Sequence, residues 1–204
     1  MGRLKTGKGQ FVGWKNLPHS LTSFSQALRR KFFGRFPRQP WIPFAASKKL
    51  DEILRSNWKV WEVGSGFSTL WLSDRVQSLV SIEASEEWFK LLCIMIEGEK
   101  IDNVDLRYEW RGSVMSDFSE LPDGHLDLLF IDGGPRSECF TKGFPKVKKG
   151  GFIYCDNWDN DDFWGKSRDY ILVDLIEEIS SCQNFVDYVP AQVGVYEGLL
   201  VRKR

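Results

Sequence analysis

Short apolar segments alternate with amphipathic segments from Ser47 onward, and this alternation is the feature that most constrains the fold. The apolar segments have the length and composition of buried strands, and the others carry apolar residues at helical spacing. Such alternation predicts a parallel sheet covered by helices on both faces, with ligands bound beyond the carboxyl ends of the strands. The expected strands are WKVWEV (58–63), SLVSIEA (78–84), VDLRYEW (104–110), LDLLFID (126–132) and FIYCDN (152–157), then an antiparallel pair, FVDYVP (185–190) and YEGLLVR (196–202). Helices are expected after a Ser47 cap and at 68–76, 85–96 and 168–179.

Length and composition favour one globular domain that also carries an arm. The chain has 204 residues, of which 42% are hydrophobic, and its apolar stretches are shorter than the roughly 18 residues that a bilayer crossing needs. No charged-then-apolar leader is recognisable, so we expect a soluble, cytoplasmic protein. The four cysteines are scattered without a C-x-x-C pair, which argues against a zinc knuckle and against a disulfide framework.

Charge is distributed unevenly along the chain. Residues 1–50 contain eleven Lys or Arg and no acid, whereas the rest carries 17 bases and 28 acids. We predict a basic arm, residues 1–40, in which a Ser20-capped amphipathic helix precedes the domain at 41–204. Three roles are open for the arm: docking on the acidic body, peripheral contact with anionic lipid or an acidic glycan, or organellar targeting.

A glycine turn follows the first strand, in the segment WEVGSGFST. Gly64 and Gly66 lie where a helix N-terminus offers free N–H groups, which suits a cofactor cradle. A dinucleotide fingerprint places a third small residue where this chain has Thr69, and it usually lacks an acid such as Glu62. Glu83 ends the next strand about twenty residues on, where a carboxylate can accept both hydrogen bonds of a ribose diol. The pattern favours an adenosine-bearing cofactor.

Five segments in order carry a resemblance to a known family: WEVGSGFST, VSIEAS, LDLLFIDGG, KKGGFIYCDN and GLLVRK. Over residues 41–202 the chain resembles class I S-adenosylmethionine-dependent methyltransferases, particularly the small-molecule and sugar-type members. The resemblance implies an α/β, Rossmann-like three-layer αβα sandwich with a seven-stranded, mostly parallel sheet and an antiparallel last strand. It implies methyl transfer to a small-molecule or glycan hydroxyl, and no specific nucleic acid. The cofactor-binding residues that it implies are Trp41, Glu62, Gly64, Ser65, Gly66, Ser68, Thr69, Glu83, Ala84 and Asp132.

Acceptor chemistry is predicted at the ends of the fourth and fifth strands. Asp132, Asp156 and Asn157 would converge on one rim, where they could orient or deprotonate an acceptor hydroxyl. The set resembles the one that holds Mg²⁺ in catechol-type methyltransferases, although Arg136 follows Asp132 here and the lysine of that family is absent. Magnesium dependence, a direct carboxylate role and a purely structural role for the set are all open. Trp158 and Trp164 are predicted to line the acceptor site.

Two other functions are open from the sequence alone. A nicotinamide-dependent reductase would use a similar sheet, but the chain lacks both the third small residue of the glycine loop and a Tyr-x-x-x-Lys pair. A non-catalytic module that binds an adenosine cofactor and docks on polyanions through its arm is the other alternative. The sequence does not indicate an oligomeric state.

Overall fold

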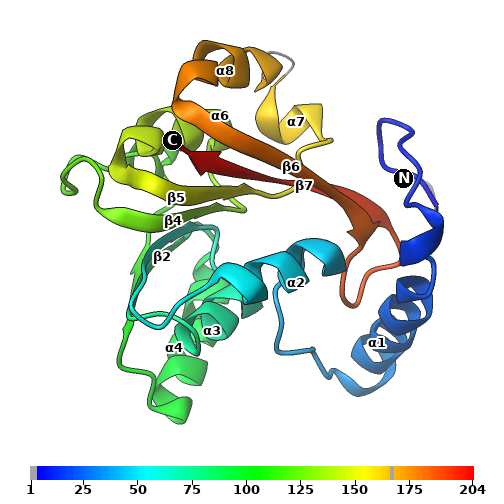
Figure 1. Ribbon diagram of the computed structural model, residues 1–204. Coiled ribbons are helices and arrows are strands. Elements are labelled where there is room, and N and C mark those ends of the chain that lie inside the picture. Colours follow the sequence, from blue (N-terminus) through cyan, green and yellow to red (C-terminus); the bar gives the residue numbers. More distant parts are fainter. Residues whose placement is uncertain (1–3, 166–167) are drawn as a thin grey trace.

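A seven-stranded sheet lies between two layers of helices in the computed structural model, which describes residues 4–165 and 168–204 (Figure 1). The strand order is β3-β2-β1-β4-β5-β7-β6. Strands β1 to β5 pair in parallel, and β7 runs antiparallel to both of its neighbours. The predicted fold class is therefore confirmed. The strands are β1 (Lys59–Val63), β2 (Ser78–Glu83), β3 (Val104–Tyr108), β4 (Leu126–Ile131), β5 (Val147–Cys155), β6 (Ile179–Tyr188) and β7 (Val195–Lys203).

The helices divide between the two faces of the sheet because successive strand residues point to opposite sides. Leu128 and Phe130 of β4 pack with residues of α2 and α3, whereas Leu129 and Ile131 pack toward α5, α6 and α8. The helices are α1 (His19–Phe33), α2 (Phe44–Ile53), α3 (Phe67–Ser73), α4 (Glu86–Glu99), α5 (Gly112–Met115), α6 (Arg136–Gly143), α7 (Asp161–Trp164) and α8 (Arg168–Asp174), and short 3-10 turns cover Trp14–Asn16, Phe144–Lys146 and Ile176–Glu178.

The parallel register brings the ends of four strands to one edge. Val63 pairs with Ile82 on one side and with Ile131 on the other, and Ile131 pairs with Cys155. The residues that follow these positions therefore emerge together. This edge holds the glycine turn after β1, Glu83 of β2, and the aspartates that follow β4 and β5.

Three predicted helix boundaries were wrong. Helix α1 begins at His19 after Pro18, and the Ser20 hydroxyl donates to the Leu17 carbonyl instead of capping. Helix α2 begins at Phe44 after Pro43, so Ser47 lies inside it. Proline suits both starts because it has no N–H to satisfy there and its φ is already helical. The last predicted helix ends early, because Ile179 already begins β6.

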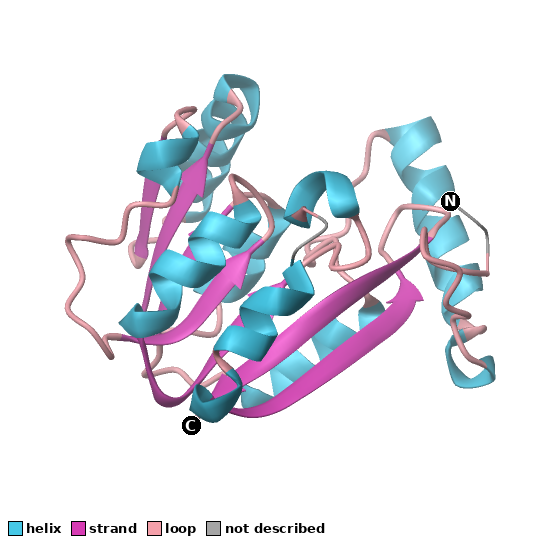
Figure 2. Cartoon of the chain, turned by 90° about the horizontal axis from the view of Figure 1, so that it is seen from above, coloured by secondary structure: helices cyan, strands magenta, loops and turns pink. Residues whose placement is uncertain are grey.

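The N-terminal arm lies against the ends of β6 and β7 (Figures 1 and 2). His19 of α1 contacts Asp187 with a nitrogen–oxygen distance of 2.7 Å, and the Ser23 hydroxyl donates to the Val189 carbonyl at 2.9 Å. Nearer the N-terminus, the Lys8 ammonium lies 3.1 Å from the Asp161 carboxylate. Docking on the acidic body is thus the arrangement seen. None of the described helices has the length and hydropathy that crossing a membrane requires.

Candidate functional site

Two turns touch at the carboxyl edge of the sheet, and glycine makes the contact possible. Gly64, directly after β1, has φ +92°, and a Cβ placed there would lie 2.6 Å from the backbone nitrogen of Gly133. Gly133 belongs to the turn after β4, and its own Cβ would lie 2.7 Å from the Gly64 Cα. Side chains are excluded from both positions. The contact places the predicted cofactor turn directly beside Asp132.

Glu62 is fully buried beneath the glycine turn and holds it in place. Its Oε2 atom accepts hydrogen bonds from the hydroxyls of Thr69, at 2.6 Å, and Ser81, at 2.5 Å. Thr69 in turn accepts from the backbone N–H of Gly66 at 3.0 Å, and the Ser65 and Ser81 hydroxyls lie 2.6 Å apart. Burial raises the pKa of Glu62 from 4.5 to about 7, against the opposing effect of the hydroxyl hydrogen bonds. Its Oε1 atom has no hydrogen-bond partner among the described residues.

Glu83 closes the opposite side of the same turn. Its side chain is nearly buried, with 8% of the residue exposed, and its Oε1 atom accepts from the Ser85 N–H at 2.7 Å. Burial raises its pKa, and the backbone N–H groups of Ser85, Ser65 and Ala84 oppose that rise. The contact with Ser65 shows that Glu83 lies beside the glycine turn. Ala84 is exposed at the outer end of β2.

Aromatic rings cover the start of α3, next to the glycine turn. The rings of Trp41 and Phe67 stack with centroids 5.8 Å apart, and Phe36 stacks on Phe67 at 5.4 Å. Trp88 of α4 meets Phe67 edge-on at 6.0 Å. The Trp41 Nε1 atom is buried and has no partner among the described residues. Sequence reasoning found Trp41 alone, although the aromatic residue immediately after Gly66 was an available signal for Phe67.

Asp132 and Asp156 form a carboxyl pair around a buried arginine. The two carboxyls lie close enough to affect each other's pKa, and the Tyr154 hydroxyl donates to the Asp156 carboxyl at 3.0 Å. The Arg136 guanidinium, 6% exposed, donates to the Asp132 carbonyl at 2.7 Å, to the Asp132 carboxylate at 3.3 Å and to the Asp156 carbonyl. Burial raises the pKa of both carboxyls, and the charge of Asp132 raises that of Asp156 further. The side chain of Asp132 is 27% exposed and that of Asp156 is buried, so Asp132 is the member of the pair open to the rim.

Comparison with known structures identifies the fold. The O-methyltransferase TomG of Streptomyces achromogenes, crystallised with S-adenosylmethionine, is 17% identical at a TM-score of 0.66, over 94% of this chain and 96% of that one. The chain has the class I methyltransferase fold. An S-adenosylmethionine-dependent O-methyltransferase of Thermotoga maritima is 16% identical at a TM-score of 0.57, over 87% and 71% of the two chains.

A tRNA methyltransferase is also among the similar structures. The tRNA (m1A58) methyltransferase TrmI of Aquifex aeolicus is 15% identical at a TM-score of 0.56, over 83% and 72% of the two chains. A partial likeness to the YcgJ protein of Bacillus subtilis, at a TM-score of 0.42, spans 44% of that protein. No protein-family model matches the sequence, and no curated protein matches it. Identities of this size show the fold and leave the acceptor undetermined.

The loop after β5 differs from what its sequence predicts. Asn157 adopts the left-handed conformation with φ +49°, two residues after β5 ends at Cys155. Trp158 and Trp164 are 5% and 2% exposed and pack edge to face with centroids 4.7 Å apart. The Trp164 indole donates to the Asp156 carbonyl at 2.8 Å. Both rings pack in the core, which leaves little of either ring to line the acceptor site as predicted, whereas the neighbouring Phe163 is 49% exposed.

Arg136 affects how the carboxyl pair could hold a metal. Within residues 4–165 and 168–204 no group of three His, Cys, Asp or Glu side chains is placed to hold an ion. The guanidinium already supplies a positive charge between the two strand ends, and it bonds to the oxygens that face it. A magnesium ion would have to be accommodated beside this fixed cation. The donor set therefore fits a magnesium ion poorly.

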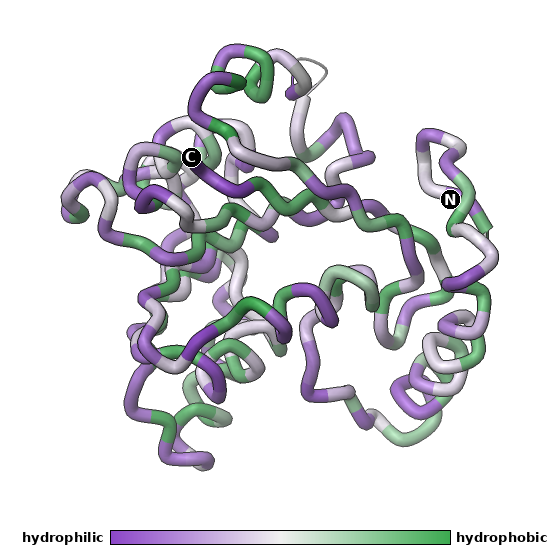
Figure 3. The backbone as a smooth tube through the Cα atoms, in the orientation of Figure 1, coloured by the Kyte–Doolittle hydropathy of each residue, from purple (hydrophilic) through white to green (hydrophobic). Residues whose placement is uncertain are grey.

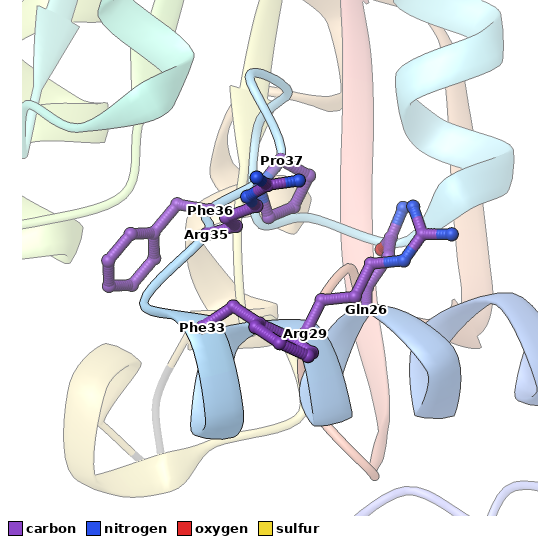
Figure 4. Close-up of a pocket in the computed structure, with 6 residues that line it drawn as sticks. All are labelled: Gln26, Arg29, Phe33, Arg35, Phe36 and Pro37. Atoms are coloured by element: carbon purple, nitrogen blue, oxygen red, sulfur yellow. The ribbon is translucent and has the colours of Figure 1, made fainter.

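A hollow of about 580 Å³ lies between α1 and the segment that leads to α2 (Figure 4). It is lined by Gln26, Arg29, Phe33, Arg35, Phe36 and Pro37. Phe36 connects the hollow to the glycine turn, because its ring also stacks on Phe67. The hollow thus adjoins the aromatic cover of the predicted cofactor site.

The residues around the glycine turn fit an adenosylmethionine-type cofactor. The unpartnered Oε1 atom of Glu62 can accept from an ammonium group, and the unpartnered Nε1 atom of Trp41 can donate to an acceptor. A Cβ at Gly66 would meet only the Ser68 hydroxyl, at 3.8 Å, so the backbone there is accessible for close approach. Buried polar atoms without partners are uncommon in folded proteins, and a polar ligand at this turn would give the Glu62 Oε1 atom a partner.

Proposed function

We propose that the protein is an S-adenosylmethionine-dependent methyltransferase that acts on a hydroxyl of a small molecule or sugar, with residues 41–204 as its catalytic domain. The observation that carries this proposal is the contact between Gly64 and Gly133, because it joins the glycine turn to the Asp132–Asp156 pair. A cofactor cradle and a pair of titratable carboxyls thereby belong to one site. The fold that the chain shares with TomG supports the same assignment.

Each side of the proposed cofactor site has a distinct task. The turn from Glu62 to Thr69 would bind the methionine end, and Glu83 with Ala84 would bind the ribose and the adenine edge. Trp41 would cover the pocket. The cofactor would supply a methyl group already activated by a positively charged sulfur, so the protein needs mainly to position the acceptor and to accept its proton.

Asp132 would orient the acceptor hydroxyl and take up its proton. Its raised pKa makes the ionised carboxyl a stronger base than an ordinary aspartate, and its partial exposure lets an acceptor reach it. Asp156 and Arg136 would hold that carboxylate in place, and the guanidinium would balance its charge without a magnesium ion. Asn157 would contribute an amide at the same rim. The acceptor would enter past Phe36 and the hollow beside α1.

Calorimetry with S-adenosylmethionine, S-adenosylhomocysteine and NADH tests the cofactor assignment. We expect the first two to bind and NADH not to bind. Preference for NADH would instead indicate a reductase, and failure of all three to bind would contradict the proposal. Methyl-donor consumption measured against sugars, nucleotide sugars, phenols and amines then identifies the acceptor. Binding without turnover on any of them would favour the non-catalytic module.

Replacing Glu83 with glutamine tests the ribose contact. We expect cofactor affinity to fall by about 1.5–3 kcal/mol, the range for hydrogen bonds to a charged group, because an amide can accept only through its single oxygen. The fold should be unchanged. Glu86→Gln, an exposed glutamate three residues further on, is the matched control and should bind as the wild type does. An unchanged dissociation constant for Glu83→Gln would remove this residue from the site.

The raised pKa of Glu62 predicts how cofactor affinity depends on pH. If Oε1 accepts from the cofactor's ammonium group, Glu62 must be ionised in the complex. Its pKa is about 7 in the free protein, so below pH 7 affinity should weaken by up to about tenfold per pH unit. Calorimetric dissociation constants measured between pH 5.5 and 7.5, roughly bracketing that pKa, should show this slope in the wild type. Glu62→Gln should lack it, and the same slope in both proteins would contradict the contact.

The same pKa predicts the sign of Glu62's effect on stability. A pKa raised from 4.5 to about 7 means that its stabilising contribution is complete below pH 4.5 and is lost as the pH rises through 7. The loss should be on the order of 3 kcal/mol for a fully buried carboxyl. Denaturant unfolding of the wild type and of Glu62→Gln between these pH values tests this: the free energy of unfolding should fall with rising pH more in the wild type than in the variant.

A further inference from the structure

We infer that α1 is a membrane-surface element, which binds bilayers containing anionic lipid through an apolar stripe that faces away from the protein body. The stripe consists of Leu21, Phe24, Leu28 and Phe32. This property is separate from methyl transfer and does not depend on the proposed activity. The arm could then both dock on the protein body and bind anionic lipid, because docking uses one side of the helix and lipid binding would use the other.

Helix α1 docks on the body through polar side chains. His19, Ser23 and Gln26 recur at intervals of three and four residues, so they lie on one side of the helix. His19 contacts Asp187, and the Ser23 hydroxyl donates to the carbonyls of Val189 and Gln192. Gln26 accepts from the Ala191 N–H at 3.3 Å. Ser23 is completely buried, so this polar side is the inner face.

The apolar side of α1 therefore faces outward. Leu21, Phe24, Leu28 and Phe32 also recur every three or four residues, and they are 74%, 52%, 39% and 68% exposed. In a helix that packs on its own domain the apolar side is normally the buried one. Hydrophobic and hydrophilic stretches both occur along α1 in the structure (Figure 3). This reversal leaves large side chains in water unless another apolar phase covers them.

The charge of the residues around the stripe indicates which kind of apolar surface covers it. Helix α1 contains no Asp or Glu, and residues 1–50 as a whole contain none. Lys31, which adjoins the stripe, forms no ion pair with any residue that the structure describes. Two copies of the chain meeting through this stripe would bring two basic arms together, which is unfavourable. An anionic bilayer surface satisfies both the apolar side chains and the bases, as for other basic amphipathic helices that lie in the membrane interface.

Co-sedimentation of the 204-residue chain with vesicles tests this inference. We expect binding to phosphatidylcholine vesicles that contain phosphatidylserine, weaker binding to phosphatidylcholine alone, and loss of binding at high salt. Phe24→Gln and Phe32→Gln should each weaken binding by about tenfold, because each removes a ring from the apolar phase. Lys31→Gln should weaken it by about fivefold on the anionic vesicles.

Matched controls test whether lipid binding depends on the stripe itself or on exposed apolar side chains in general. Ile94→Gln removes an exposed side chain of α4 that is 68% exposed, as Phe32 is, and should bind as the wild type does. Lys149→Gln is the control for charge. Thermal melting should be the same for all variants, since none removes a buried contact. Absence of binding to the anionic vesicles, equal loss in Ile94→Gln, or a wild-type protein that self-associates through Phe24 and Phe32 in size-exclusion chromatography would each overturn the inference.

Discussion

Gly64→Ala is expected to abolish measurable S-adenosylmethionine binding and to lower the free energy of unfolding by about 1–3 kcal/mol or more. The native φ of +92° disfavours any side chain, and the new methyl group would lie 2.6 Å from the Gly133 nitrogen and 2.7 Å from the Asp132 carbonyl carbon. These neighbours are backbone atoms and cannot rotate away. The turns after β1 and β4 must therefore separate, which displaces the cradle and Asp132 together. Calorimetry and denaturant unfolding measure the two effects.

Two other glycines serve as controls for this substitution. Gly66 has an extended backbone, and a Cβ there has no neighbour closer than 3.8 Å. Gly66→Ala should keep wild-type stability yet weaken cofactor binding, because the methyl group would enter the space of the ligand. Gly98→Ala in α4 should bind normally and gain about 0.5–1 kcal/mol in stability, the usual preference for alanine in a helix. Wild-type affinity in both Gly64→Ala and Gly66→Ala would contradict the proposed cradle.

Asp132→Asn is expected to reduce turnover by about a hundredfold to ten-thousandfold, the contribution typical of a general base. The substitution keeps the size of the side chain and its contact with Arg136, but an amide cannot take up the proton of the acceptor. Because a base works in its ionised form, the rate of the wild type should rise with pH through the raised pKa of Asp132. Methyl-donor consumption with an identified acceptor, measured across pH, provides both readouts.

Variants of Asp156 and Arg136, together with a chelator, distinguish a direct carboxylate role of Asp132 from a metal-binding role. Asp156→Asn should lose less activity, because Asp156 is buried and would position Asp132 without contacting the acceptor. Arg136→Met should cost about 3–5 kcal/mol in stability, since it leaves the buried Asp156 carboxyl and the partly exposed Asp132 carboxyl without the neighbouring cation. Activity insensitive to chelator and lost in Asp132→Asn would support a direct role for the carboxylate. Activity removed by chelator and restored by magnesium would overturn the metal-independent proposal, and full activity in both aspartate variants would place the chemistry elsewhere.

Much of the fold could be predicted from local pattern. The central strands were recognisable because a parallel strand buried on both faces is apolar over a short run, as LDLLFI in β4 is. Helix starts were less predictable, since Pro18 and Pro43 begin α1 and α2 where nearby serines looked like better caps. The placement of Glu62, Glu83, Asp132 and Asp156 near one edge followed from their positions at strand ends, which parallel pairing brings together.

By itself, the sequence determined the strand order along the chain, the glycines of the turn and the acids at the strand ends, because these depend on residues close together in the chain. Only the tertiary structure decided which of those groups interact. It placed the Ser81 hydroxyl of β2 on Glu62, set Arg136 between two strand ends, and buried Trp158 and Trp164 in the core. It also turned the polar side of α1 inward. Such contacts join segments far apart in sequence, and local periodicity carries no information about which distant surface a residue will meet.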